Sequence, residues 1–373
     1  MSDRFVRTSH APAKPAPRIQ IGWVRWAREN LFSSLLNGLL TVVALSLLLV
    51  LLPPFLDWAF FSAVFSAVDG SACRTDGVGA CWAFVEAKFG QFLFGRYPDA
   101  ERWRVILTLV LCIAGLAPLL IPNRLPKQWL VTYLLVPFPV LAFILLSGGF
   151  FGLEKVETSD WGGLMVTLVV ALTGIAASLP LGVLLALGRR SEMPVVRMFS
   201  VIFIEFWRGV PLITVLFMSS VMLPLFLPEG MSFDKLLRAL IGVALFSSAY
   251  MAEVVRGGLA AVPTGQYEAG KALGLTYWQS MSRIVLPQAL TTVIPGIVNN
   301  FIGLFKDTTL VLVIGLFDLL GIVQSNSTDP TWLSPQTATT GYVFAAFVFW
   351  IFCFGISRYS VYMERRLEAG VQR

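Results

Sequence analysis

Six long stretches without a charged residue dominate the sequence and restrict what the chain can fold into. An α-helix rises 1.5 Å per residue, so about 20 apolar residues cross the hydrocarbon core of a bilayer. Each stretch is long enough for that, and the sequence therefore predicts an all-α polytopic membrane protein. The stretches cover 30–56, 105–123, 128–153, 161–188, 284–305 and 331–357.

The composition excludes a water-soluble globule. Hydrophobic residues make up 56% of the 373 residues and charged residues 13%, whereas soluble domains carry about 25% charged residues. A transmembrane β-barrel would show alternating segments of about 10 residues, and the sequence has none. The net charge of +6 does not call for nucleic acid, because basic loops orient membrane proteins. We expect no nucleic-acid partner.

The first 30 residues are hydrophilic, basic and rich in proline and alanine. Their length argues against a cleaved signal peptide, and their composition predicts a disordered tail over 1–30. They include His10, the only histidine of the chain. With one histidine and four cysteines, no metal-ligand spacing exists. We expect no metal, no cofactor and no catalytic residue in this chain.

Two further apolar stretches contain charges. The stretch 198–227 holds Glu205 and Arg208, and the stretch 239–255 ends near Glu253. Adding them predicts about eight transmembrane helices. Their bounds are about 35–56, 105–122, 129–150, 161–187, 198–227, 237–256, 288–318 and 337–358.

Lysine and arginine in the loops orient these helices. If the N-terminus is cytoplasmic, the inside segments hold 18 of these residues and the outside segments hold 8. We therefore expect both termini in the cytoplasm and the loop 57–104 outside. The chain divides near 150. The predicted parts are a tail over 1–30, a three-span extension over 31–150, a five-span core over 151–360 and a C-terminal cytoplasmic tail over 361–373.

Two cysteines lie in the external loop. Cys73 and Cys81 have seven residues between them, and an oxidising compartment favours a small disulfide loop at such a pair. A disulfide and two free thiols are both compatible with the sequence. Cys112 and Cys353 fall inside predicted spans, where they serve packing.

The longest internal cytoplasmic connection is 257–287. It is neither charged enough for a linker nor apolar enough to span, and it predicts two short helices with a corner at Gly274. Thr276 is a candidate N-cap of the second helix. An amphipathic hairpin resting on lipid headgroups has the same composition. The loop also contains a specific pattern, in which Glu268 is followed by Gly274 and then by Ile284, Leu286 and Pro287.

This pattern resembles the EAA loop of ATP-binding-cassette importer permeases, whose consensus is E-A-A, three residues, G, nine residues, I-x-L-P. Ala269 matches and Gly270 replaces the second alanine, which loosens a helix by up to about 1 kcal/mol. The resemblance implies that the loop docks on an ATPase, with Glu268 on the docking helix. Lys271 is expected to pair with Glu268 on one helix face.

Four segments resemble the polar amino acid uptake permeases, and they cover most of 160–320. They are "EFWRGVPLITVLF", "AYMAEVVRGGLAAVPTGQYEAG", "ALGLTYWQSMSRIVLPQAL" and "LFKDTTLVLVIGLFDL". The whole chain is similar to a membrane subunit of bacterial general L-amino-acid importers. That resemblance implies the inner membrane, a type I permease core, a heterodimer with a second permease, a homodimeric cytoplasmic ATPase that binds ATP and Mg, and a periplasmic amino-acid-binding protein.

Charges inside a bilayer are costly, so each needs a partner or a function. We expect Glu253 and Arg256 to form a structural pair, because they are three residues apart on one helix face. Glu205 and Arg208 share that spacing. They are expected either to neutralise each other or to bind the carboxylate and ammonium of an amino acid. The further candidates for a substrate path or gate are Trp207, Asn299, Asn300, Lys306 and Asp307.

Two functions compete with an importer subunit. A secondary transporter or channel for small polar solutes would use the charges within the spans, but the sequence shows no internal repeat and this function leaves the EAA-type spacing unexplained. A membrane-embedded enzyme lacks a nucleophile–base pair and an acidic metal motif. No G-x-x-x-x-G-K-[ST] phosphate loop occurs, so ATP hydrolysis is expected in a separate subunit.

Overall fold

The computed structural model describes residues 22–121, 126–226, 228 and 233–371. Within these residues, seven helices are long and apolar enough to cross a membrane, and one bent helix pair brings the number to eight. The all-α fold with about eight spans is therefore confirmed. Contacts divide the chain into two compact units, one of residues 1–63 and 76–80 and the other of residues 64–75 and 81–373.

The first unit contains α1 (Trp23–Asn30) and α2 (Leu35–Leu56). The Ser34 hydroxyl accepts a hydrogen bond from the backbone N–H of Asn37 and caps α2. Helix α2 is almost entirely apolar, and none of its side chains is buried within the first unit. Of the predicted disordered tail, 1–21 lies outside the described residues, while Trp23–Asn30 is helical.

The second unit begins with the region predicted as an external loop. Here α3 (Trp82–Phe94) packs against α7, α15 and α16, and Phe84 and Phe92 are fully buried in that packing. The next elements are α4 (Arg102–Leu120), α5 (Lys127–Leu135) and α6 (Pro137–Ser147). Of these, α4 and the α5–α6 segment are candidate spans.

The core of the second unit is built around the long helices α7 and α10, which pack against each other. Helices α8, α9, α13 and α14 surround them, and α14 in turn packs against α16. The bounds are α7 (Gly163–Arg189), α8 (Pro194–Gly209), α9 (Leu212–Phe217), α10 (Lys235–Ala261), α13 (Leu286–Thr292), α14 (Ile294–Asp307), α15 (Leu319–Asn326) and α16 (Thr337–Val371). A two-residue strand, β1 (Phe317–Asp318), bridges Gly162 and Gly163.

The span predicted over 198–227 is not one straight helix. Helix α8 ends at Gly209, α9 starts at Leu212, and the segments up to Phe226 lie at 101° to α8. Pro211 has no N–H to donate to α8 and disfavours the helical region for the residue before it. Accordingly, Val210 is extended, with φ −110° and ψ 133°.

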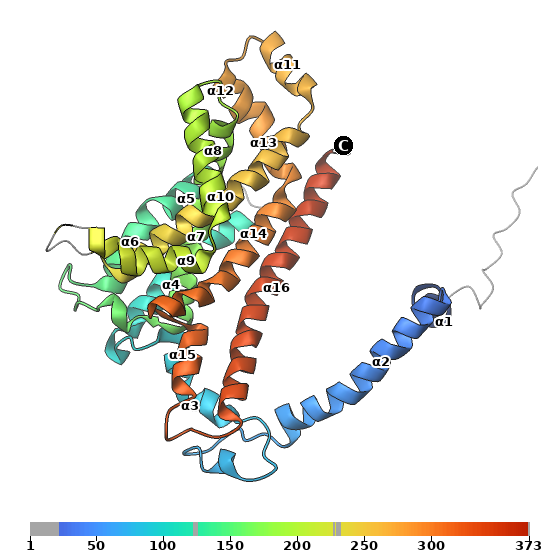
Figure 1. Cartoon of the computed structure of the whole chain (residues 1–373), viewed down its shortest axis with the longest axis vertical. Helices are drawn as coiled ribbons and strands as arrows, with labels where there is room; N and C mark the ends of the chain where they lie inside the picture. The colour runs from blue at the N-terminus through green and yellow to red at the C-terminus, as the bar shows by residue number, and fades with distance from the viewer. Residues whose placement is uncertain (1–21, 122–125, 227, 229–232, 372–373) are drawn as a thin grey trace, which may run out of the picture. The chain divides into compact units, whose positions relative to one another are not determined.

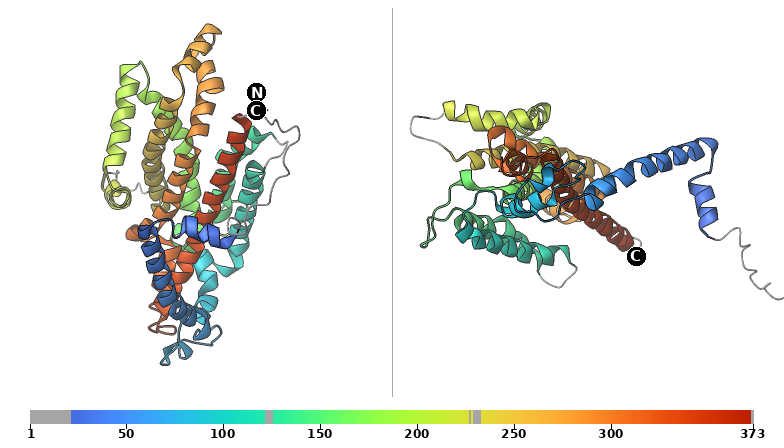
Figure 2. Two further views of the ribbon diagram at one scale, coloured as in Figure 1. Left: turned by 90° about the vertical axis from the view of Figure 1, so that its right-hand side faces the viewer. Right: turned by 90° about the horizontal axis from the view of Figure 1, so that it is seen from below.

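Two short helices project from one end of the second unit. They are α11 (Thr264–Ala272) and α12 (Tyr277–Ser280), and the C-terminal end of α16 lies at the same end (Figures 1 and 2). Helices α3 and α15 lie at the opposite end. Residues 361–371, expected as a tail, continue α16 as helix.

Candidate functional site

The corner between α11 and α12 is fixed by backbone hydrogen bonds. Gly274 has a φ of +69°, as its position in the sequence predicts. The N–H of Gly274 donates to the carbonyl of Lys271 at 3.0 Å, and the N–H of Leu275 donates to the carbonyl of Gly270 at 3.1 Å. This pair of bonds is a Schellman motif, in which a left-handed residue ends the helix and satisfies its last carbonyls. Glycine adopts that conformation without steric cost.

The second helix is fixed just as firmly at its start. The Thr276 hydroxyl accepts from the N–H of Gln279, and the Gln279 side chain accepts from the N–H of Thr276. This capping box satisfies two N–H groups that a helix start leaves unpaired. From Ser280 the chain passes through a π-helical turn, η8 (Met281–Val285), into α13. The corner therefore has a defined geometry on both sides.

Gly270 permits close packing between α11 and the helix that follows the corner. A Cβ at position 270 would overlap the Ser280 Oγ and lie 3.2 Å from the Ser280 Cβ. Gly270 itself is buried. At this close approach, a Cβ at position 270 would require the Ser280 side chain to shift, which glycine avoids.

The rest of the pattern divides into an exposed and a packed part. Glu268, Ala269 and Lys271 are exposed on α11. Within the described residues no ion pair joins Glu268 to Lys271, so the expected pairing does not form. Ile284 and Leu286 are partly buried, and Pro287 is exposed at the start of α13.

Exposed apolar side chains flank the corner, and the sequence reasoning did not single them out. Leu273 is 74% exposed and Trp278 is 65% exposed, with Tyr277 beside Trp278. The sequence does contain a pattern that predicts them, because apolar residues lie on both sides of Gly274 in a segment outside any predicted span. We call Glu268, Lys271, Leu273, Tyr277 and Trp278 the α11–α12 surface.

Arg190 ties this segment to the end of α7. Its guanidinium donates to the Leu259 carbonyl and to the Tyr267 hydroxyl, both at 3.0 Å, and lies over the Tyr267 ring. The Tyr267 hydroxyl donates to the Leu259 carbonyl at 3.1 Å. One cation thus joins the ends of α7 and α10 to α11.

A second charged cluster links α7, α8 and α10 around Glu253. The Glu253 carboxylate accepts from Arg189 at 2.8 Å and from Arg256 at 3.0 Å, and Arg208 lies 3.7 Å away. The Glu253–Arg256 pair forms as expected. Arg189 was missed, because its partners are distant in sequence and meet it only in the folded chain.

Glu205 and Arg208 do not form the pair that their spacing suggested. Arg189 donates to Glu205 at 2.9 Å, while Arg208 faces Glu253 and lies over the Tyr250 ring, 5.8 Å from its centre. Among the described residues no ion pair joins Glu205 to Arg208. The cation bound to Glu205 is instead Arg189, at the end of α7.

Comparison with known proteins identifies the chain. Residues 178–369 match the family model described as "Binding-protein-dependent transport system inner membrane component". These residues contain α8–α14, the corner at Gly274 and the Glu253 cluster. The chain belongs to this permease family.

Relatives that match the permease over almost its full length are amino-acid transporter subunits. It is 54% identical over 370 residues to the inner membrane amino-acid ABC transporter permease protein YhdY of Escherichia coli K12, covering 98% of each chain. It is 42% identical over 436 residues to the glutamate/glutamine/aspartate/asparagine transport system permease protein BztC of Rhodobacter capsulatus, covering 99% of each.

A solved structure titled "Crystal structure of an amino acid ABC transporter with histidines" matches part of the permease. It is 30% identical, covers 55% of this chain and 92% of the other, and has a TM-score of 0.47.

The other candidate path residues lie on two helices of the permease. Trp207 is partly buried on α8 and contacts the rings of Phe203 and Phe206. On α14, Asn299 and Lys306 are exposed, while Asn300 and Asp307 are partly buried. In the described part of the chain, no hydrogen bond or ion pair connects these four α14 side chains to the Glu253 cluster.

Cys73 and Cys81 form a disulfide at the other end of the permease. The neighbouring Arg74 donates to the carbonyls of Leu333 and Pro330 at 2.9 and 3.0 Å. The N–H of Cys81 donates to the Thr340 hydroxyl at 2.9 Å. These bonds fasten the cysteine loop to the first turn of α16 and to the segment before it. Within the described residues no group of three histidine, cysteine or acidic side chains is placed to hold a metal.

Proposed function

We propose that this chain is the membrane subunit of an ATP-driven, binding-protein-dependent importer of L-amino acids in the bacterial inner membrane. Membership of the permease family and the amino-acid transport named for YhdY and BztC support this proposal. The observation that carries the mechanism is the rigid, projecting corner at Gly274 with its exposed α11–α12 surface.

In this proposal the α11–α12 surface docks on a cytoplasmic ATPase. Leu273 and Trp278 offer apolar area, while Glu268 and Lys271 offer one charge of each sign. Clustered aromatic and apolar anchors with a charged rim are typical of protein interfaces. Gly270, Gly274, Ile284, Leu286 and Pro287 maintain the shape of the docking element, and Ala269 lies on its exposed side.

Movement of the docked segment would reach the spans through Arg190. Since this guanidinium binds both α11 and the end of α10, displacement of α11 pulls on α7 and α10 together. Rigid-body movement of helices about an interface is a common form of conformational switching. ATP and Mg are bound by the ATPase, a homodimer, and this chain supplies no catalytic residue.

The chain forms half of the translocation path, and a second permease in a heterodimer forms the rest. A periplasmic amino-acid-binding protein delivers the cargo on the side of the Cys73–Cys81 loop. Both termini are cytoplasmic in this orientation, which the excess of basic residues in the inside segments supports.

Cargo contact is proposed for the side chains of α8 and α14 that the sequence singled out. Arg208 and Glu205 supply charges complementary to an amino-acid carboxylate and ammonium. Trp207, Asn299, Asn300, Lys306 and Asp307 line the path or its gate.

The test is assembly and ATP hydrolysis in lipid, with this chain, a candidate second permease, an ATPase and a binding protein. Wild type is expected to hydrolyse ATP faster when binding protein and an L-amino acid are both present. Leu273→Glu should abolish co-purification of the ATPase. The control Leu333→Glu places the same charge on a Leu that is 55% exposed at the opposite end, and should leave the ATPase bound.

Uptake without ATP by a chain that never binds an ATPase would overturn the proposal in favour of a secondary transporter. Equal loss of ATPase in Leu273→Glu and Leu333→Glu would overturn the docking surface alone.

A further inference from the structure

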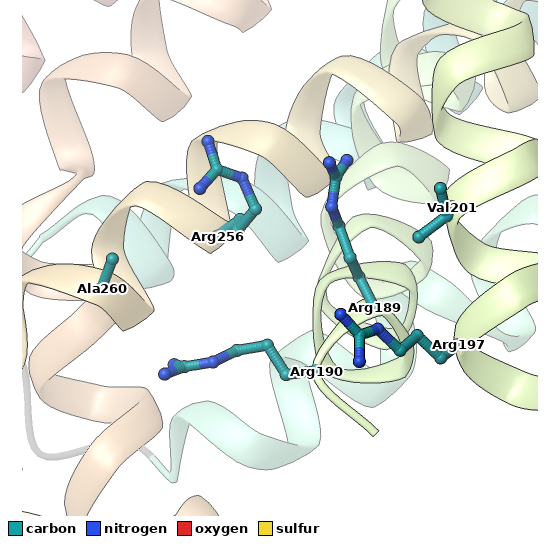
Figure 3. A pocket seen from close by; sticks show the side chains of 6 residues that line it. All are labelled: Arg189, Arg190, Arg197, Val201, Arg256 and Ala260. Carbon is teal, nitrogen blue, oxygen red and sulfur yellow. The ribbon is translucent and has the colours of Figure 1, made fainter. Parts of the chain in front are cut away.

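A pocket of about 450 Å³ lies between the ends of α7, α8 and α10. It is lined by Arg189, Arg190, Arg197 and Arg256, together with Val201 and Ala260. Figure 3 shows the four arginine side chains around this space, from the three helix segments. We call these four residues the arginine pocket.

Positive charge in the arginine pocket exceeds the negative charge bound to it. Arg189 and Arg256 share Glu253, and Arg189 also binds Glu205. Among the described residues, Arg190 donates only to neutral oxygens, those of Leu259 and Tyr267. Four guanidiniums therefore face two carboxylates, and Glu192, on the loop after α7, is not part of the lining.

Arg197 is an exposed member of the arginine pocket without a partner from the described part of the protein. Among the residues that the structure describes, its side chain has no hydrogen-bond or ion-pair partner, although three other cations line the same space. Like charges gathered in one cavity repel each other. An anion in the cavity removes that repulsion and uses guanidinium donors that are otherwise unpaired.

The position of the pocket along the membrane normal indicates the kind of anion. Arg189 is the last residue of the spanning helix Gly163–Arg189, so the pocket lies at the level of the lipid headgroups. Basic pockets between helices on the cytoplasmic side suit phosphate-bearing headgroups, and the guanidinium fork matches phosphate oxygens in pairs. We propose that the arginine pocket binds a phosphate group at the cytoplasmic surface of the membrane. This inference rests on the orientation in the proposed function.

The phosphate could be supplied by an anionic phospholipid or by free phosphate, and one experiment separates them. The full-length chain in neutral detergent is unfolded thermally, with tryptophan fluorescence as the readout. Short-chain phosphatidylglycerol, short-chain phosphatidylcholine, inorganic phosphate and L-glutamate are titrated in turn. We expect a saturable rise in unfolding temperature with phosphatidylglycerol or with inorganic phosphate, and none with phosphatidylcholine.

Arg197→Gln should weaken that binding about tenfold, since one charge-assisted hydrogen bond is lost. Arg365→Gln is the matched control, because Arg365 is an exposed arginine near the end of α16, outside the pocket, and its affinity should stay within about twofold of wild type. Arg197→Glu serves as a second variant, and it should abolish the rise in unfolding temperature that the phosphate compounds cause. A lower half-saturating concentration for phosphatidylglycerol than for inorganic phosphate assigns the lipid, and the opposite order assigns free phosphate.

The proposal is overturned if neither phosphate compound shifts unfolding, if both glutamine variants lose binding equally, or if L-glutamate binds more tightly than phosphate. None of these readouts requires an ATPase. Failure of ATP-driven import therefore leaves this result standing, and loss of phosphate binding leaves the import proposal standing.

Discussion

Gly270 and Ser280 lie in direct contact across the corner at Gly274, close enough that a Cβ at position 270 would overlap the Ser280 Oγ. The EAA pattern that this loop resembles has alanine at the position of Gly270, so the contact coincides with the departure from that pattern. Substitution of Gly270 by alanine tests this contact, because the expected change in unfolding free energy is opposite to the one that helix propensity predicts.

Gly270→Ala should lower the unfolding free energy, although alanine is the better helix former. The gain in helix propensity is at most about 1 kcal/mol, whereas overpacking costs about 1–3 kcal/mol. In a Ser280→Ala background the same change should become neutral or stabilising, because the overlapping oxygen is absent. Denaturant unfolding of the wild type, the two single variants and the double variant in detergent gives the coupling energy. Identical effects of Gly270→Ala in both backgrounds would contradict the contact.

Tyr267→Phe should loosen the connection between α11 and α7. The substitution keeps the ring under Arg190 and removes the hydroxyl that binds both Arg190 and the Leu259 carbonyl. We expect a loss of about 1 kcal/mol and a weaker response of ATP hydrolysis to the binding protein. Tyr359→Phe, on α16, is the matched control. Unchanged stimulation in Tyr267→Phe would show that Arg190 does not transmit movement.

Glu253→Gln should destabilise the fold far more than Glu205→Gln. The Glu253 side chain is 16% exposed and faces three arginines, while the Glu205 side chain is 54% exposed and binds one. Removing one partner from a largely buried ion pair costs about 3 kcal/mol, and an exposed pair contributes about 1 kcal/mol or less. The denaturant midpoints of the two variants are compared with that of the wild type, and the midpoint of Glu253→Gln should be the lower of the two. Similar midpoints would argue against Glu253 as the centre of the cluster.

Replacing Cys73 and Cys81 by serine should loosen the cysteine loop and its partner segment together. A disulfide with a sequence separation of 8 stabilises by about 2–3 kcal/mol. Because Arg74 joins the loop to Leu333 and Pro330, hydrogen exchange should rise in both segments. Exchange that rises only around residues 73–81 would mean that the two segments are not coupled. The Cys112→Ser variant controls for loss of a thiol.

Asp318 predicts a pH dependence of stability. Burial raises the pKa of Asp318 to about 6, although its carboxylate accepts hydrogen bonds from the N–H groups of Leu320 and Gly321. The unfolded chain ionises at a lower pH, so the native state holds the extra proton between about pH 4 and pH 6. The unfolding free energy contributed by this group is therefore highest below pH 4 and falls as pH rises to about 6.

Asp318→Asn should remove that dependence, because asparagine caps a helix without titrating. The unfolding temperature of both proteins is measured from pH 4 to pH 7. Asp318 lies after the spanning helix that ends at Ile314, so buffer reaches the site when the chain opens. If the unfolding temperatures of the two proteins change with pH in parallel, Asp318 is not the source of the pH dependence.

The sequence predicts the spans well because a charge-free run records membrane burial directly. It also places Gly274 and Thr276, since a left-handed corner and a helix cap depend on a few neighbouring residues. It does not predict the partners of Glu205, because Arg189 reaches it across helices. The bend after Gly209 is visible locally at Pro211, but its angle of 101° depends on what α9 packs against.

The bend between α8 and α9 has a consequence for solvation. Every helix end leaves several carbonyl or amide groups without partners inside the helix, and such groups are tolerated at membrane depth only beside protein or water. The end of α8 and the start of α9 therefore bring peptide dipoles of both signs to one level of the bilayer. Backbone atoms at this level, whose chemistry no mutation of side chains removes, therefore require protein or water beside them.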